Sequence, residues 1–259
     1  MKKTLFLLLI CSLTACTKNK FEHVYLGLNG KFSSVEVTIY NGPNELTFKE
    51  KPLGDFMGVE IYTFDNNGYL IERRSYNDPT KKALSERDSY SRDKKGNIIE
   101  TYSGFNLSND YISETLWRML EKDGNKEKWQ EIDENDWWGT SYREIEYLSD
   151  KKEIKEYIIQ KKSGETSNRI ATTETYNKRG QMVSQTIDRE GNSPIDTKIW
   201  TYNDNGHLLK IEGEQLRTDG SVNKTENASY TINKEDEYNN PLQVTDNDGN
   251  IKIFKYSYR

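Results

Sequence analysis

The sequence predicts an all-β protein, an antiparallel meander of about fourteen strands in an open or wrapped repeat sheet. A pattern of aromatic, turn and apolar residues recurs about every 28 residues from Tyr62 to Tyr258, and a fixed period of this kind is typical of repeat architectures. The chain also combines 33% hydrophobic residues with 17 tyrosines and 5 tryptophans. This balance favours thin, half-wet β-structure over a deep core or a disordered chain.

Each repeat predicts a β-hairpin. Segments 62–71, 90–99, 176–183 and 200–209 share an aromatic residue, Asp or Asn, two variable residues, Gly, and then apolar residues. Rings two residues apart on a strand lie on one face of the sheet. Asp or Asn then bends the chain by bonding the backbone, and Gly adopts the positive φ that other residues resist. The apolar pair begins the returning strand.

The predicted turns follow the same period, apart from a longer final interval before Pro241. They are centred on Gly68, Gly96, Gly124, Glu153, Gly180, Gly206 and Pro241. Second turns fall between them, at 77–79, 162–164, 189–191, 219–220 and 248–249. Each period therefore holds two strands, and consecutive strands pair in order. Two repeats depart from the pattern. Near Gly124, the positions that are aromatic in the other repeats hold non-aromatic residues, and at Glu153 the glycine is missing.

Two further segments need separate treatment. Residues 31–47 predict an opening hairpin, with a strand at 35–40 and a turn at 41–43. Residues 108–122 place apolar residues at helical spacing after a candidate N-cap, which favours a short helix. The repeat register continues across the same segment and favours a strand.

The first residues form a signal sequence. Lys2 and Lys3 precede a short apolar run, which is too short to span a bilayer. Residues 13–16, Leu-Thr-Ala-Cys, resemble the lipobox of bacterial lipoproteins. The resemblance implies a signal peptide at 1–15, cleavage before Cys16 and acyl chains on Cys16. We then expect a lipidated N-terminus and tether at 16–24 and, from the repeats, a β-hairpin repeat domain at 25–259. Several acyl chains hold a protein stably on a membrane. The alternative is a plain secretory signal.

The repeat resembles a second family. The Tyr-Asp-x-x-Gly type of unit, together with the closing segments 238–242, 246–250 and 255–258, is similar to the YD or RHS-like repeats of bacterial surface and toxin-associated proteins. The resemblance covers residues 62–258. It implies β-hairpins that wind into a continuous sheet, and no single activity. The chain is far shorter than the closed shells of the large RHS proteins.

No catalytic constellation emerges. His23 lies in the tether, and His207 follows a turn glycine in a position that other repeats fill with varied polar residues. Carboxylates alternate with lysines, as on a solvated sheet face, so a glycosidase-like pair is disfavoured. Asp246 and Asp248 resemble a calcium loop, but the ligand spacing of an EF-hand is not met. We expect a non-enzyme without cofactor or metal, and the net charge of −5 without a basic stripe disfavours nucleic acid.

The tryptophans are the candidate binding residues. Four of the five lie close together in the sequence: Trp117, Trp129, Trp137 and Trp138. Adjacent strand residues face opposite sides, so one of Trp137 and Trp138 could serve as a stacking platform or an interface anchor. The alternative is that the rings simply cover a sheet face.

We therefore expect a non-enzymatic binding module of the cell envelope, tethered through Cys16, with a protein or glycan partner and a toxin-immunity role as one form. The alternatives are an assembly scaffold and, less favoured, a hydrolase. Thr17 in place of Asp after the cysteine favours the outer membrane, and residues 18–20 lack an acidic surface-export signal. These features predict the periplasmic face.

Overall fold

The computed structural model describes residues 31–41, 55–108, 111–132, 139–160, 163–189 and 194–259, and these contain only strands, turns and loops. The sixteen strands are β1 Phe32–Tyr40, β2 Phe56–Phe64, β3 Leu70–Tyr76, β4 Leu84–Arg92, β5 Ile98–Ser108, β6 Tyr111–Asp123, β7 Lys126–Glu131, β8 Gly139–Tyr147, β9 Lys151–Gln160, β10 Thr166–Tyr176, β11 Met182–Arg189, β12 Ile195–Tyr202, β13 Leu208–Leu216, β14 Val222–Glu235, β15 Pro241–Asp246 and β16 Ile251–Tyr258. The all-β prediction is confirmed. Among the residues described, no helix is long and apolar enough to cross a membrane.

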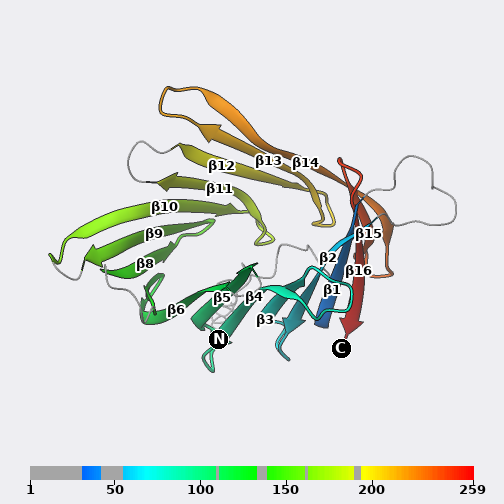
Figure 1. Ribbon diagram of the computed structural model, residues 1–259, viewed down its shortest axis with the longest axis horizontal. Coiled ribbons are helices and arrows are strands. Elements are labelled where there is room, and N and C mark those ends of the chain that lie inside the picture. The colour runs from blue at the N-terminus through cyan, green and yellow to red at the C-terminus, as the bar shows by residue number, and fades with distance from the viewer. Residues whose placement is uncertain (1–30, 42–54, 109–110, 133–138, 161–162, 190–193) are drawn as a thin grey trace, which may run out of the picture.

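The strands form a closed barrel. Each strand pairs antiparallel with its neighbours in sequence, and β1 pairs with β16, with Val37 opposite Phe254. Figure 1 shows the sheet wrapping round until β16 lies beside β1. The prediction of about fourteen strands in an open or wrapped sheet is therefore corrected. Seven hairpins run from β2 to β15, one near each predicted turn, while β1 and β16 add two strands and close the ring.

The strand interpretation holds for the ambiguous segment. Residues 111–123 form β6, which pairs with both β5 and β7, so the proposed short helix near 108–122 is wrong for the described residues 111–122. The predicted opening strand lies within β1. Its partner on the other side is β2, which starts at Phe56. The predicted turn at 41–43 falls largely outside the described residues.

Six hairpin turns share one hydrogen-bonding pattern. The N–H of the first residue donates to the carbonyl of the fifth at 2.8–3.0 Å, and the first side chain accepts the N–H of the fifth at 2.8–2.9 Å. The six turns span 65–69, 93–97, 177–181, 203–207, 236–240 and 246–250. Gly68, Gly96, Gly180 and Gly206 hold the positive-φ position, and Gly124 has positive φ in the β6–β7 turn. This is the local chemistry expected of Asp/Asn-x-x-Gly.

Two predicted turn centres are wrong. Glu153 lies inside β9, and the turn falls instead at residues 148–150 between β8 and β9. Pro241 begins β15, and Asn239 takes the positive φ of 60°. The proline ring locks φ at a negative value, so proline cannot occupy that position. Asn is among the residues that adopt it most readily.

The carboxylates in the hairpin turns are expected to make the stability of the barrel sensitive to acid. The side-chain hydrogen bond from Asn97 lowers the pKa of Asp93, and that from Ser221 lowers the pKa of Asp219. A carboxyl group whose pKa is lower in the folded than in the unfolded state stabilises the fold at any pH above its unfolded-state pKa, which is near 4. This contribution is lost as the pH falls through the folded-state pKa. We expect Asp93→Asn with Asp219→Asn to change urea stability little at pH 7, because Asn203 and Asn205 fill the equivalent positions of the β12–β13 turn. We expect the same double variant to lessen the loss between about pH 5 and pH 2.

The control for this measurement is Asp188→Asn, which alters an exposed carboxylate on β11 for which the structure gives no side-chain hydrogen bond. It should leave the pH profile of the parent unchanged. Identical acid profiles for the parent and the double variant would contradict the assignment of acid sensitivity to these turns.

The barrel has two different faces. A cavity lined by residues of seven consecutive strands, β4 to β10, marks the inward, concave face. Because side chains alternate between the two faces of a strand, the residues of β8 and β9 next to the cavity-lining ones point outward. These outward residues include Glu144, Glu146, Lys155, Tyr142 and Tyr157. Exposure likewise alternates along β14, where the exposed positions 225, 227, 229, 231 and 233 are all Thr, Asn or Ser. On these three strands the outward face is therefore largely polar and charged.

Both described chain ends lie at one rim of the barrel. The N–H of Arg259 donates to the carbonyl of Lys31 at 3.1 Å, and the Arg259 guanidinium donates to Asn66 in the β2–β3 turn at 2.9 Å. Hairpin turns from β2–β3 to β14–β15 share this rim, because every second turn of an up-and-down barrel lies at the same end. The segment that precedes Lys31 therefore joins the barrel at its tight-turn rim.

Candidate functional site

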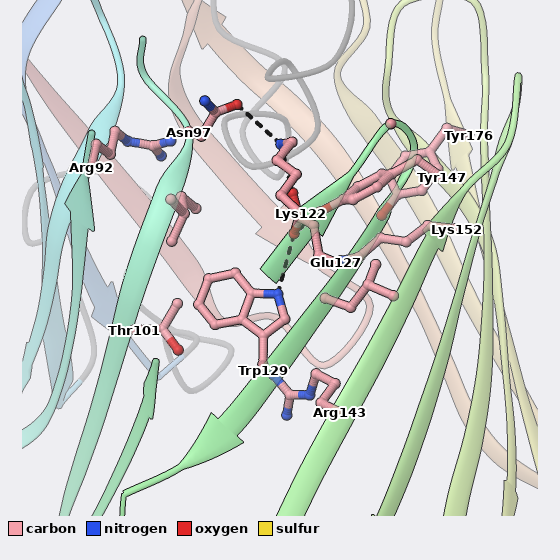
Figure 2. Close-up of a pocket in the computed structure, with 13 residues that line it drawn as sticks. Arg92, Asn97, Thr101, Lys122, Glu127, Trp129, Arg143, Tyr147, Lys152 and Tyr176 are labelled. Carbon is pink, nitrogen blue, oxygen red and sulfur yellow. Dashed lines mark hydrogen bonds and ion pairs between the residues drawn. The ribbon is translucent and has the colours of Figure 1, made fainter. Parts of the chain in front are cut away.

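The inward face holds a cavity of about 160 Å³. It lies in the lumen near the tight-turn rim, since it borders on Asn97 and Gly124 from two of the turns. Figure 2 shows Trp129 in the middle, with Arg92 and Asn97 on one flank of the cavity and Tyr147, Lys152 and Tyr176 on the other. Aromatic and aliphatic side chains form part of the wall, and charged side chains form the rest.

A nearly buried carboxylate, that of Glu127 on β7, sits at the centre of the wall with 7% exposure. It accepts hydrogen bonds from Lys122 at 2.7 Å, from the Trp129 indole N–H at 3.2 Å and from the Tyr147 hydroxyl at 3.2 Å. A charge removed from water must be paired and hydrogen-bonded to be tolerated. Glu127 meets that condition through residues of three neighbouring strands, β6, β7 and β8.

Three cationic side chains line the cavity around this carboxylate. Lys122 also donates to Asn97 at 3.0 Å, and Lys152 lies 3.2 Å from Glu174 on β10. Arg143 pairs with Glu156 at 2.6 Å, and its guanidinium lies 4.3 Å from the centre of the Trp117 ring. Such stacking on an indole adds to the attraction of the ion pair.

A fourth cation, Arg92, is fixed by the backbone. Its guanidinium donates to the carbonyl oxygens of Gly96 at 3.0 Å and Leu70 at 3.4 Å, and lies 4.8 Å from the centre of the Tyr69 ring. Arg92 thereby joins the β2–β3 and β4–β5 turns. It contributes positive charge at the rim side of the cavity.

A separate charged group lies on the inward face of β2, β3 and β4. Arg73 contacts three carboxylates, Glu86 at 2.5 Å, Asp88 at 2.9 Å and Glu60 at 3.5 Å. Burial, and then the charge of Glu60, raise the pKa of the adjacent Tyr62 far above its ordinary value. This tyrosine therefore serves as a neutral hydrogen-bond donor to Glu60, at 2.7 Å.

The tryptophans divide between the lumen and the part not described. Trp117 and Trp129 are 8% and 5% exposed and pack with Ile145 in one hydrophobic cluster. Both therefore act as packing elements of the inner wall, and Trp129 also borders the cavity. Trp137 and Trp138 lie outside the described residues, as do Cys16 and His23.

His207 is one of the most buried side chains, with 2% exposure. Its Nδ1 lies 3.1 Å from a Glu235 carboxylate oxygen, close in distance but poorly aligned for a hydrogen bond. Asp246 heads the β15–β16 turn, as a hairpin interpretation of its segment predicts. Within the described residues, no group of three or more His, Cys, Asp or Glu side chains is placed to hold a metal ion.

Sequence reasoning missed the charged wall of the cavity. Glu127, Arg143 and Lys152 belong to strands whose alternating Lys and Glu residues suggested a solvated outer face. That interpretation is wrong for these three, because β7, β8 and β9 carry charges on both faces. The one available signal was the pair of apolar residues Ile145 and Ile154. Side chains alternate between the two faces of a strand, so residues an even number of positions away from these two lie on the inward face.

Comparison with known proteins adds little. No family model matches the sequence, and no curated protein matches it. Among solved structures, the crystal structure of a porin-like protein from Bacteroides uniformis is similar, with 9% identity and a TM-score of 0.40. The similarity covers 87% of this chain and 96% of that chain.

Proposed function

We propose that the protein is a non-enzymatic binding module of the cell envelope. In this proposal lipid on Cys16 tethers it to the periplasmic face of the outer membrane. The barrel stands in water beside the membrane, and its lumen receives a small ligand. The observation that carries the proposal is the charge on the outward face of β8 and β9, together with a walled polar cavity inside.

The outward face supports a barrel that stands in water. A barrel that spans a membrane turns an apolar band about 25 Å tall toward the lipid. Here the outward positions of β8 and β9 carry Glu144, Glu146 and Lys155, and the exposed positions of β14 from 225 to 233 carry Thr, Asn and Ser. Charged side chains at the middle of a bilayer cost about 2–4 kcal/mol each for Arg or Lys. Attachment through acyl chains avoids that cost, since only the lipid enters the bilayer.

The test separates tethering from insertion. In Leu13→Ala with Cys16→Ser, residues 13–15 become Ala-Thr-Ala, the small-x-small site of an ordinary secretory signal. We expect the unmodified chain to float with outer membranes and be released by detergent. The double variant should be exported and recovered almost entirely in the soluble periplasmic fraction, with an unchanged β-sheet circular dichroism spectrum. A folded double variant that still sediments with outer membranes would overturn the proposal.

A further inference from the structure

The cavity wall has spare hydrogen-bond donors, while most of the accepting capacity of its carboxylate is already used. Lys122 uses two of its three N–H groups, on Glu127 and Asn97, and Lys152 uses one, on Glu174. Arg143 directs Nε and Nη2 toward Glu156, which leaves Nη1 for another partner. Glu127 meanwhile already accepts three of the about four hydrogen bonds that a carboxylate can take. The wall therefore favours a ligand that brings acceptors over one that brings donors.

The charge of the wall agrees with the hydrogen bonds. Four cations line the cavity and Glu127 is the one carboxylate among its described lining residues. Glu156 and Glu174, which pair with Arg143 and Lys152, lie just outside the lining, so four cations face three carboxylates and one positive charge remains uncompensated. Positive charge in a walled, poorly solvated site attracts an anion more strongly than it would in open water.

The size of the cavity limits the ligand. About 160 Å³ is roughly half the lower end of the range usual for drug-sized ligands. We infer that the cavity binds a small organic carboxylate, about the size of a single sugar acid, with its carboxylate between Lys152, Lys122 and Arg143. This inference names the ligand class of the lumenal site in the proposed function and rests on that function.

The test compares three probes of one shape. Titration of the purified barrel with D-glucuronate, D-glucose and D-glucosamine, followed by tryptophan fluorescence, isolates the charge because the ring is common to all three. We expect saturable quenching by glucuronate at least tenfold tighter than by glucose, the factor one charge-assisted hydrogen bond supplies, and none by glucosamine. Acetate should compete with glucuronate.

Two matched variants locate the site. Lys152→Met should weaken glucuronate binding about tenfold or more, while Glu174 keeps Tyr176 and Gln185 as donors, so the fold is retained. Lys155→Met, on the outward face of the same strand, should leave binding unchanged. If Lys152→Met loses structure by circular dichroism, Lys152→Arg replaces it and should retain binding within a few fold.

The outcomes distinguish the inference from the proposed function. Equal affinity for glucose and glucuronate would overturn the anionic ligand and leave a lumenal binding module standing. Equal loss of glucuronate binding in Lys152→Met and Lys155→Met would overturn the location. No saturable response to glucuronate or acetate would overturn the inference, whereas failure of the fractionation test would overturn the tethered barrel.

Discussion

Replacing Trp129 with alanine is expected to lower the free energy of unfolding by about 3–5 kcal/mol, the usual cost of truncating a buried aromatic side chain to alanine. The ring is 5% exposed and packs with Trp117 and Ile145 against partly buried neighbours from β5, β6, β8 and β9. Its loss would open a void in one of the apolar clusters of the inner wall. It would also remove one of the three donors to Glu127.

Urea or guanidinium unfolding followed by circular dichroism measures this effect. Trp129→Phe keeps most of the ring volume and removes the indole N–H, so it should cost about 1 kcal/mol, the value of one hydrogen bond. Leu120→Ala, a 50% exposed position on neighbouring β6, is the matched control and should cost less than about 1 kcal/mol. A loss in Trp129→Ala no larger than that in Leu120→Ala would mean that the inner wall does not hold the barrel together.

Replacing Arg73 with methionine is expected to destabilise the barrel by about 1–3 kcal/mol at pH 7, a figure reduced from that of a buried pair by solvent screening. The change leaves Glu60, Glu86 and Asp88 facing one another without their shared cation. Removing one partner of a buried ion pair costs about 3–5 kcal/mol. The Arg73 side chain is 29% exposed, so water screens part of this cost.

The same variant has a distinctive salt dependence. Its deficit relative to the parent should shrink as NaCl rises from about 0.1 M to about 1 M, because salt screens the repulsion among the three partly exposed carboxylates. Arg74→Met, the next residue on the outward face, removes a 45% exposed partner of Glu72 and should cost less than about 1 kcal/mol at either salt concentration. Urea unfolding at the two salt concentrations checks both variants. A deficit in Arg73→Met that is independent of salt would argue against charge repulsion as its cause.

The hairpins were predictable because their causes are local. Asp or Asn followed three residues later by Gly specifies a turn through bonds among five adjacent residues, as at 65–69 and 93–97. The two errors of turn placement arose where local chemistry departed from the pattern. Asn239 replaced the glycine, and the turn at 148–150 lacked one.

The sequence alone determined the antiparallel hairpins and their order, because turn bonds and strand alternation act over a few residues. Only the tertiary structure decided the number of strands, the closure and the cavity. Closure depends on β1 meeting β16, at the opposite end of the described chain, and no local preference encodes that pairing. The face on which Glu127, Arg143 and Lys152 lie depends in turn on the direction in which the sheet curves. Charged residues on both faces of β7, β8 and β9 left that direction undetermined until the ring was closed.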